Sequence, residues 1–236
     1  MRVGLIVPMF ERSPASALSV AQEADAKGID GVFCYDHLFP INRPDRPALS
    51  AIPMLAAIAM TTQRVMLGPL VGRVTLLPLP VLLGAFATVD QLSGGRLIAA
   101  LGTGDALTKP ENDAYGLPFP VLDERLQLLA EAARGLRALG VRTWIGGRSA
   151  RVRDLAVAEA DGWNVWDSPL DELAAFAGAH PEVEVTWAGP PPADDLGRHL
   201  LSVAATGATW AIYGPPPTVA WVGFIDKLAE AAEGVR

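Results

Sequence analysis

Short apolar runs rich in valine, isoleucine and tryptophan recur along the chain, and each is bounded by glycine, proline or aspartate. The runs are apolar throughout rather than alternately apolar and polar, which is typical of strands buried on both faces of a parallel sheet. We therefore predict eight buried strands, at residues 2–8, 31–35, 64–71, 96–101, 142–146, 162–166, 182–188 and 208–213.

Longer segments rich in alanine and leucine separate these runs and carry the start and stop signals of helices. Ser13-Pro14 and Ser168-Pro169 each offer a capping residue followed by a proline in the first turn, and Ser149 offers a third cap. We predict helices from Ser13-Pro14 to residue 27, at 48–60 and 81–92, along the apolar face from Leu122 to Leu136, after Ser149, after Ser168-Pro169, at 194–206 and at 218–233.

Alternation of strands and helices predicts a parallel sheet with right-handed crossovers. Eight repeats in 236 residues fit an α/β fold of the (β/α)8 TIM-barrel type at near-minimal length. The alternative is a doubly wound open sheet, which usually has a glycine fingerprint after its first strand. The turn here is Pro8-Met9-Phe10-Glu11 and has no glycine. Since no segment has the composition of a linker, we expect a single domain over residues 1–236.

Composition narrows the possible partners. Half of the residues are hydrophobic, and 19 basic against 26 acidic side chains give a net charge of −7, which argues against nucleic acid as the main partner. The single cysteine, Cys34, excludes an internal disulfide and a thiolate-rich metal site. The uncharged stretches 47–63 and 74–89 are interrupted by proline or polar residues, so we expect no membrane span. The opening strand pattern lacks the features of a signal peptide, and a cytoplasmic location is the expectation.

The active site of a TIM barrel lies at the C-terminal ends of its strands. Asp36-His37 follows the second predicted strand, so an imidazole with a carboxylate nearby would face the site. The alternative is a histidine held by loop hydrogen bonds with no chemical role. Only this histidine falls at a predicted strand end, so we expect no metal centre.

Two glycine segments also fall at strand ends. Gly102-Thr103-Gly104 would allow close approach of a flat ligand or a phosphate, or would only form a turn, before a long loop that holds Asn112. Gly146-Gly147-Arg148 before the cap Ser149 fits an anion site at a helix N-terminus, or a tight turn with a solvated arginine. The charges between residues 124 and 131 are expected to form a solvated helix face.

The ordered set of segments resembles the luciferase-like monooxygenase superfamily, most closely the branch that uses the deazaflavin coenzyme F420, with users of FMN as the sister branch. Each motif alone is common, but the set recurs in order over residues 1 to about 166. The segments are Asp36-His37, Leu92-Ser-Gly-Gly-Arg-Leu, Gly102-Thr-Gly-Asp, Asn112-Asp-Ala-Tyr-Gly-Leu-Pro-Phe, the Glu124-Arg125 helix, Trp144-Ile-Gly-Gly and Ala160-Asp-Gly-Trp-Asn.

The resemblance implies a TIM barrel that holds a flavin-type ring at its C-terminal face, with Asp36 and His37 beside the ring. It implies a non-prolyl cis peptide at Leu70 and Val71 that supports the ring. Further cofactor contacts are implied at Gly102, Thr103, Gly104 and Asn112, and a site for the phosphate-bearing tail at Gly146, Gly147 and Arg148.

The leading functional hypothesis is hydride transfer between F420 and a small organic substrate, with His37 moving the proton and Asp36 orienting His37 or contacting the ring. One alternative is an FMN-dependent monooxygenase of the same superfamily. The other is a flavin-binding protein without turnover, such as a silent subunit, because the chain is shorter than many members. The resemblance also implies a homodimer, for which the apolar helices at 48–60 and 81–92 could supply the interface.

Overall fold

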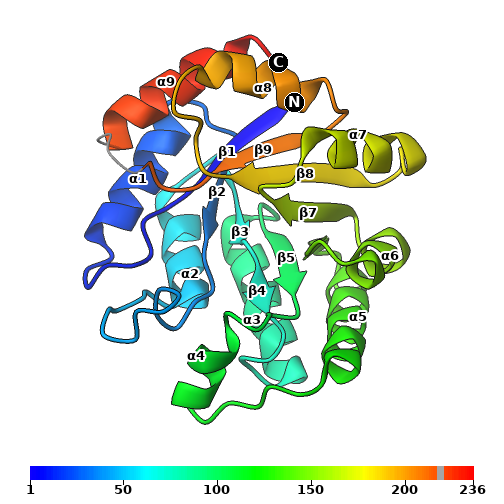
Figure 1. Ribbon diagram of the computed structural model, residues 1–236. Coiled ribbons are helices and arrows are strands. Elements are labelled where there is room, and N and C mark those ends of the chain that lie inside the picture. The colour runs from blue at the N-terminus through cyan, green and yellow to red at the C-terminus, as the bar shows by residue number, and fades with distance from the viewer. Residues whose placement is uncertain (217–220) are drawn as a thin grey trace.

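The computed structural model describes residues 1–216 and 221–236. In those residues nine parallel strands form one sheet in the order β3-β2-β1-β9-β8-β7-β6-β5-β4. A bridge between Leu67 and Leu97 brings β3 beside β5, so that the sheet is a nearly closed barrel. Figure 1 shows the helices arranged around the strands, with α4 lying apart from this ring. The predicted TIM-barrel fold is confirmed.

The strands are β1 (Arg2–Ile6), β2 (Gly31–Cys34), β3 (Met66–Pro69), β4 (Gly72–Arg73), β5 (Ile98–Gly102), β6 (Arg142–Gly146), β7 (Gly162–Trp166), β8 (Glu184–Gly189) and β9 (Trp210–Tyr213). The helices are α1 (Ala15–Ala26), α2 (Ala51–Thr61), α3 (Leu79–Ser93), α4 (Lys109–Ala114), α5 (Leu122–Ala138), α6 (Ala150–Glu159), α7 (Leu170–Ala179), α8 (Leu196–Ala204) and α9 (Trp221–Glu233). Within the described residues, none of these helices is long and apolar enough to cross a membrane.

Three predicted elements differ from the structure. The strand expected at 64–71 contains only β3. A cis peptide bond between Leu70 and Val71, the position that the resemblance implied, lies between β3 and the short strand β4, which is beyond the expected end. The loop expected after β5 contains α4, a short helix with a proline in its first turn. Helix α7 begins after Pro169, and the hydroxyl of Ser168 donates to the Glu172 carboxylate instead of capping the helix. The start expected for the last helix, Thr218, lies outside the described residues.

Apolar side chains fill two layers. The inner layer lies within the barrel, where Phe33, Trp144 and Trp210 pack with ring centroids 5.6 to 5.9 Å apart. The outer layer lies between the strands and the surrounding helices. Strands covered on both faces need apolar residues at every position, which explains the continuous apolar runs in the sequence.

At the N-terminal end of the barrel, the arginine of the Leu92-Ser-Gly-Gly-Arg-Leu segment serves a structural role. Its guanidinium donates to the backbone carbonyls of Ala59, Thr62 and Val65, and its Nε donates to the carbonyl of Ser93. Arg96 thereby joins the C-terminal ends of α2 and α3 to the start of β3. The fold therefore accounts for the arginine of this segment without a role in binding or catalysis.

Asp25, near the end of α1, fixes the chain that leads into β3. Its carboxylate accepts from the backbone N–H groups of Gln63, Arg64 and Val65 at 2.8 to 2.9 Å. Arg64 and Val65, which were expected in the third strand, therefore precede β3 instead of joining the sheet. Burial alone would raise the pKa of Asp25, but these N–H donors and the Arg64 guanidinium hold it below its ordinary value.

We predict that Asp25→Asn lowers the free energy of unfolding by about 1–3 kcal/mol at neutral pH, because the amide removes the charge and one acceptor. A carboxylate whose pKa is lowered in the folded protein contributes stability at every pH above the ordinary aspartate pKa of about 3.9. That contribution is lost as the pH falls through the lowered pKa of the folded state. Urea unfolding of both proteins from pH 7 downward should show the difference shrinking in acid. A difference that stays constant with pH would contradict the assignment.

Candidate active site

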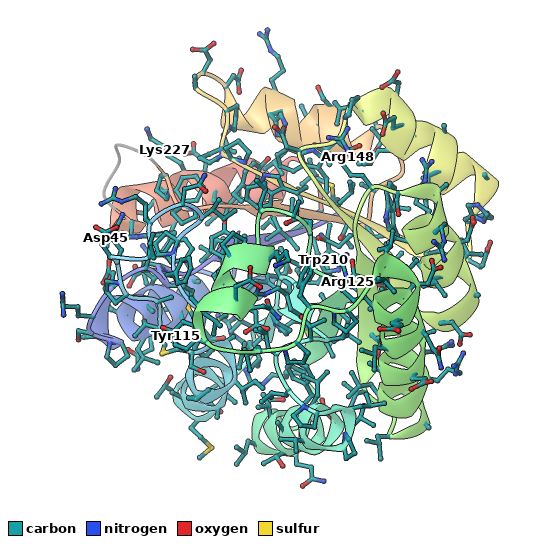
Figure 2. The ribbon with its side chains drawn as sticks, turned by 60° about the horizontal axis from the view of Figure 1, so that its bottom comes forward. Asp45, Tyr115, Arg125, Arg148, Trp210 and Lys227 are labelled. Atoms are coloured by element: carbon teal, nitrogen blue, oxygen red, sulfur yellow. The ribbon has the colours of Figure 1, made fainter. Side chains whose placement is uncertain are left out.

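Side chains from three separate parts of the chain meet at the C-terminal end of the barrel. They come from the segment after β2, from β4 and from α4, which lies in the loop after β5. Figure 2 turns this end forward, with α4 in front of the barrel, Tyr115 next to α4 and Arg125 on α5.

The imidazole of His37 is held by Glu111 of α4. Nδ1 of His37 lies 2.7 Å from Oε1 of Glu111, and the backbone N–H of Leu38 donates to Oε2 at 2.6 Å. The Glu111 side chain is fully buried, whereas 18% of the His37 side chain is exposed. His37 is therefore anchored on one edge and accessible on another.

Arg73 of β4 links the other groups of the site. Its Nη2 donates to Oε2 of Glu111 at 2.8 Å, and its Nη1 donates to Oδ1 of Asn112 at 3.1 Å and to the carbonyl of Thr108 at 3.3 Å. Its Nε donates to the carbonyl of Asp36 at 3.0 Å, and its backbone N–H donates to the Asp36 carboxylate at 2.9 Å. One buried cation thus fixes both α4 and the segment that carries His37.

The two carboxylates of this network respond differently to burial. Burial would raise the pKa of Glu111, but hydrogen bonds from His37 and Leu38 and the charge of Arg73 hold it below its ordinary value. Burial raises the pKa of Asp36, and the hydrogen bond and charge from Arg73 oppose the rise only in part. Glu111 is therefore the carboxylate that stays ionised beside His37 at neutral pH.

Of the two roles expected for Asp36, the orientation of His37 belongs to Glu111, and contact with the ring stays a prediction. The carboxylate that holds His37 is Glu111, because Asp36 is tied to the backbone of β4 instead. The sequence gives no signal for Glu111, because the segment that holds it has no apolar periodicity and Asn112 and Asp113 follow it directly. In the structure, α4 buries Glu111 and Asn112 and leaves Asp113 exposed.

Asn112 lies in the buried network. It accepts from Arg73, and its amide donates to the carbonyl of Pro118 at 2.8 Å and to the Thr75 hydroxyl at 3.3 Å. The residue has no exposed surface. Its contact with a cofactor stays a prediction, and what the structure shows is a link between α4, β4 and the chain leading to α5.

The side chain of Val71 explains why residues 102 and 146 are glycines. A Cβ atom on Gly102 or on Gly146 would lie 2.5 Å from a methyl group of Val71, so both strand ends need glycine to accommodate this side chain. Val71 also packs against the inner layer of the barrel and is partly exposed above it. Val71 therefore forms the floor at the C-terminal end of the barrel between β5 and β6.

Arg125 of α5 holds the turn after β5. The charged residues between 124 and 131 were expected to form a solvated helix face, and Arg125 departs from this expectation. The guanidinium of Arg125 donates to the carbonyls of Thr103 and Gly104 at 3.1 and 2.7 Å and lies over the ring of Phe119. Gly104 has a φ of 68°, a conformation that glycine adopts without strain. Burial lowers the pKa of Arg125.

The turn after β6 leads directly into α6. Gly147 has a φ of 142°, and the hydroxyl of Ser149 accepts from the backbone N–H of Val152 at 3.3 Å, so the predicted cap is confirmed. Arg148 is exposed, with its Nη2 3.9 Å from the Glu172 carboxylate. The exposed guanidinium and the helix N-terminus suit an anionic group.

Aromatic rings border the accessible edge of His37. The rings of Phe10 and Tyr35 stack at 5.7 Å, and both have centroids 6.0 Å from that of His37. Trp166, at the end of β7, lies 6.0 Å from Tyr35 and is 42% exposed. We call Phe10, Tyr35 and Trp166 the aromatic wall. With Val71 as the floor, these side chains offer apolar surface to a planar ligand beside His37.

The opposite end of the barrel has a hollow of about 570 Å³, lined by side chains of mixed charge that include Arg2, Asp30 and Glu184. Glu184 accepts from Trp144 Nε1 and pairs with Arg142, while Arg2 lies over the Trp210 ring. These charges serve to close the barrel, as expected of the N-terminal end. Among the described residues, no group of His, Cys, Asp and Glu side chains is placed to hold a metal ion.

The chain belongs to the luciferase-like monooxygenase family, whose profile matches residues 1–140. It is similar to the F420-dependent glucose-6-phosphate dehydrogenase of Nakamurella multipartita, with 30% identity over 190 residues, 80% of this chain and 53% of the relative. The enzyme of that name from Beutenbergia cavernae is 34% identical over 160 residues, 66% of this chain and 47% of the relative. The chain thus spans about half the length of the curated relatives it matches.

Solved structures with this fold cover nearly the whole chain. An F420-dependent secondary alcohol dehydrogenase in complex with an F420-acetone adduct aligns with a TM-score of 0.82 at 16% identity, covering 100% of this chain and 99% of that one. The coenzyme F420-dependent tetrahydromethanopterin reductase from Methanopyrus kandleri aligns with a TM-score of 0.76 at 14% identity, covering 98% and 97%. At these identities the likeness establishes the fold.

We predict that Arg73→Met lowers the free energy of unfolding by about 3–5 kcal/mol, because it leaves the buried Glu111 carboxylate without its cation. Lys109→Met is the matched control on α4, since it breaks the exposed pair with Asp113 and should cost about 0–1 kcal/mol. Denaturant unfolding at neutral pH measures both. Equal losses in the two variants would show that the Arg73 network does not hold the site together.

Proposed function

We propose that this protein is an oxidoreductase that transfers a hydride between coenzyme F420 and a small organic substrate, with His37 as the catalytic acid or base. The observation that carries the proposal is the placement of His37, which Glu111 anchors at the accessible end of the barrel. The names of the relatives support the choice of cofactor, since the curated matches described above are F420-dependent dehydrogenases.

The residues at the C-terminal end of the barrel fit a deazaflavin. The aromatic wall and the Val71 floor offer apolar surface to a planar ring, and the exposed Arg148 with the N-terminus of α6 offers positive potential to a phosphate-bearing tail. The cofactor would supply two-electron chemistry as a hydride acceptor or donor. The predicted contacts of Leu70, Gly102, Thr103 and Gly104 belong to this proposal, because their backbone lies at the same strand ends.

His37 would move the proton that accompanies the hydride. Its exposed edge can exchange a proton with a hydroxyl or carbonyl oxygen of the substrate, while Glu111 holds the opposite edge. In this scheme the Asp36 carboxylate accepts a hydrogen bond from the backbone N–H of Arg73 and so holds β4 beside the segment that carries His37. The aromatic wall would limit the access of water to the reacting groups.

An FMN-dependent monooxygenase is the second candidate, favoured by the family's description and by fold neighbours such as the 3,6-diketocamphane monooxygenase component in complex with FMN. The third is a flavin-binding protein without turnover.

Titration of the purified protein with F420 and separately with FMN, followed by ligand fluorescence, distinguishes these candidates. Preferential binding of F420, followed by its reduction with propan-2-ol or glucose 6-phosphate, supports the proposal. Preference for FMN favours the monooxygenase, and F420 binding without reduction by a wider panel of alcohols favours the binding protein. Binding of neither cofactor contradicts the assignment.

His37→Ala is predicted to lower kcat by about 10²–10⁴-fold and to leave the Kd for F420 unchanged, because the imidazole moves a proton and does not hold the ring. His180→Ala is the control, since that histidine lies at the end of α7, away from the site. Steady-state kinetics and fluorescence titration measure the two effects separately. A variant that loses binding but retains turnover would show that the role is wrongly assigned.

We also propose that the protein forms a homodimer through the outer faces of α2 and α3, which pack against each other. Helix α2 has no charged residue and α3 has only Asp90, while Met60 and Leu92 are 64% and 45% exposed near the ends of these helices. Two adjacent helices with a single charged residue between them suit contact with another apolar surface.

The double variant Met60→Glu, Leu92→Glu should sediment as a monomer where the wild type sediments as a dimer, because it places charges in the interface. Leu201→Glu, at an equally exposed position on α8, should leave the dimer intact. Sedimentation velocity decides between these outcomes. A wild-type monomer, or a double variant that remains dimeric, would contradict the proposed interface.

A further inference from the structure

The hydrogen bonds around Glu111 determine which nitrogen of His37 carries the hydrogen of the neutral imidazole. Oε1 of Glu111 lies 2.7 Å from Nδ1 of His37, and Oε2 accepts from the Leu38 N–H and from Arg73 Nη2 at 2.6 and 2.8 Å. An ionised carboxylate can only accept hydrogen bonds. The short contact with Nδ1 therefore requires the hydrogen of the neutral imidazole to be on Nδ1.

We propose that Glu111 is a positioning residue that locks neutral His37 in the Nδ1–H tautomer and so leaves the Nε2 lone pair to accept a proton from the substrate. The reaction role rests on the proposed function. For an alcohol substrate, the C–H bond breaks and its electron pair leaves with the hydrogen as a hydride to oxidised deazaflavin. The O–H bond breaks and its proton passes to Nε2 of His37, while the carbon–oxygen double bond forms.

Arg73 and Leu38 determine which oxygen of Glu111 faces His37. Both donate to the same oxygen of Glu111, which leaves the other oxygen for His37. The side chain is fully buried, so no water competes for these positions. The tautomer of His37 therefore depends on a group that never reaches the substrate.

Glu111→Gln tests this directionality without a change in side-chain size. A glutamine has one accepting oxygen and one donating nitrogen. Since two donors converge on the Oε2 position, the oxygen of the glutamine should face Arg73 and Leu38, and its amide nitrogen should face His37. Nδ1 must then accept, so the imidazole hydrogen moves to Nε2, and the group that faces the substrate becomes a donor.

The ring nitrogens of ¹⁵N-labelled histidine report the tautomer by NMR in the cofactor-free protein. Spectra would be recorded about two pH units above the ordinary histidine pKa of ~6.5, with His37→Ala to assign the signal. We expect Nδ1–H in the wild type and in the control Asp113→Asn, which changes an exposed carboxylate on the same helix. We expect Nε2–H in Glu111→Gln.

Turnover provides the second measurement. Glu111→Gln should lower kcat by about 10²–10⁴-fold with an unchanged Kd for F420, because an imidazole in the wrong tautomer cannot accept the proton. Asp113→Asn should match the wild type. A purely structural role for Glu111 would instead weaken F420 binding and leave the tautomer as it is in the wild type.

The results separate this inference from the proposed function. Nε2–H in wild-type His37, or an unchanged tautomer in Glu111→Gln, overturns the inference whatever the protein binds. If Glu111→Gln does not fold, the wild-type spectrum alone decides. The expected tautomers without any binding of F420 would overturn the proposed function and would still support the positioning of His37 by Glu111.

Discussion

The buried ion pair between Arg73 and Glu111 is the interaction on which the rest of the site depends. Both side chains are almost completely removed from water, at 3% and 0% exposure, which is costly for charged groups unless they are paired and hydrogen-bonded. The Arg73 guanidinium meets that condition with three further hydrogen bonds, to the carbonyls of Asp36 and Thr108 and to Asn112. The pair joins residues 38 positions apart in the sequence, so the site assembles only when the barrel closes.

Placement of the network within the fold links stability to chemistry. Arg73 lies two residues after Val71, and Glu111 lies on a short helix beyond the end of β5. The same hydrogen bonds that position α4 over the barrel also anchor His37. A luciferase-like barrel can host several reactions, and what distinguishes this one is the set of groups that its loops bring to the open end.

The sequence predicted the architecture well, because its signals are local. Continuous apolar runs and helix start signals located the strands and helices of the described residues apart from α4 and β4, although Ser13 and Ser168 do not cap their helices. The cis peptide between Leu70 and Val71 was accessible only through the resemblance to a known family, since nothing in the two side chains indicates it.

The site was less predictable, because its key contacts join distant segments. His37 could be selected as a histidine at a strand end, but its partner could not. Glu111 lies beside Asp113 in a segment without periodicity, and only the turn of α4 decides which carboxylate enters the interior. Likewise, Gly102 was expected to admit a ligand and Gly146 to form an anion site or a tight turn, but the neighbour that requires both glycines is Val71 of the same chain.

A crystal structure of the protein with F420 tests the central claim most directly. We expect the deazaflavin ring at the C-terminal end of the barrel, in contact with Val71 and the aromatic wall and beside the exposed edge of His37, with the Arg73–Glu111 pair intact beneath it. A ring bound at the opposite end of the barrel, or one seated only after Glu111 has left His37, would contradict this account of the site.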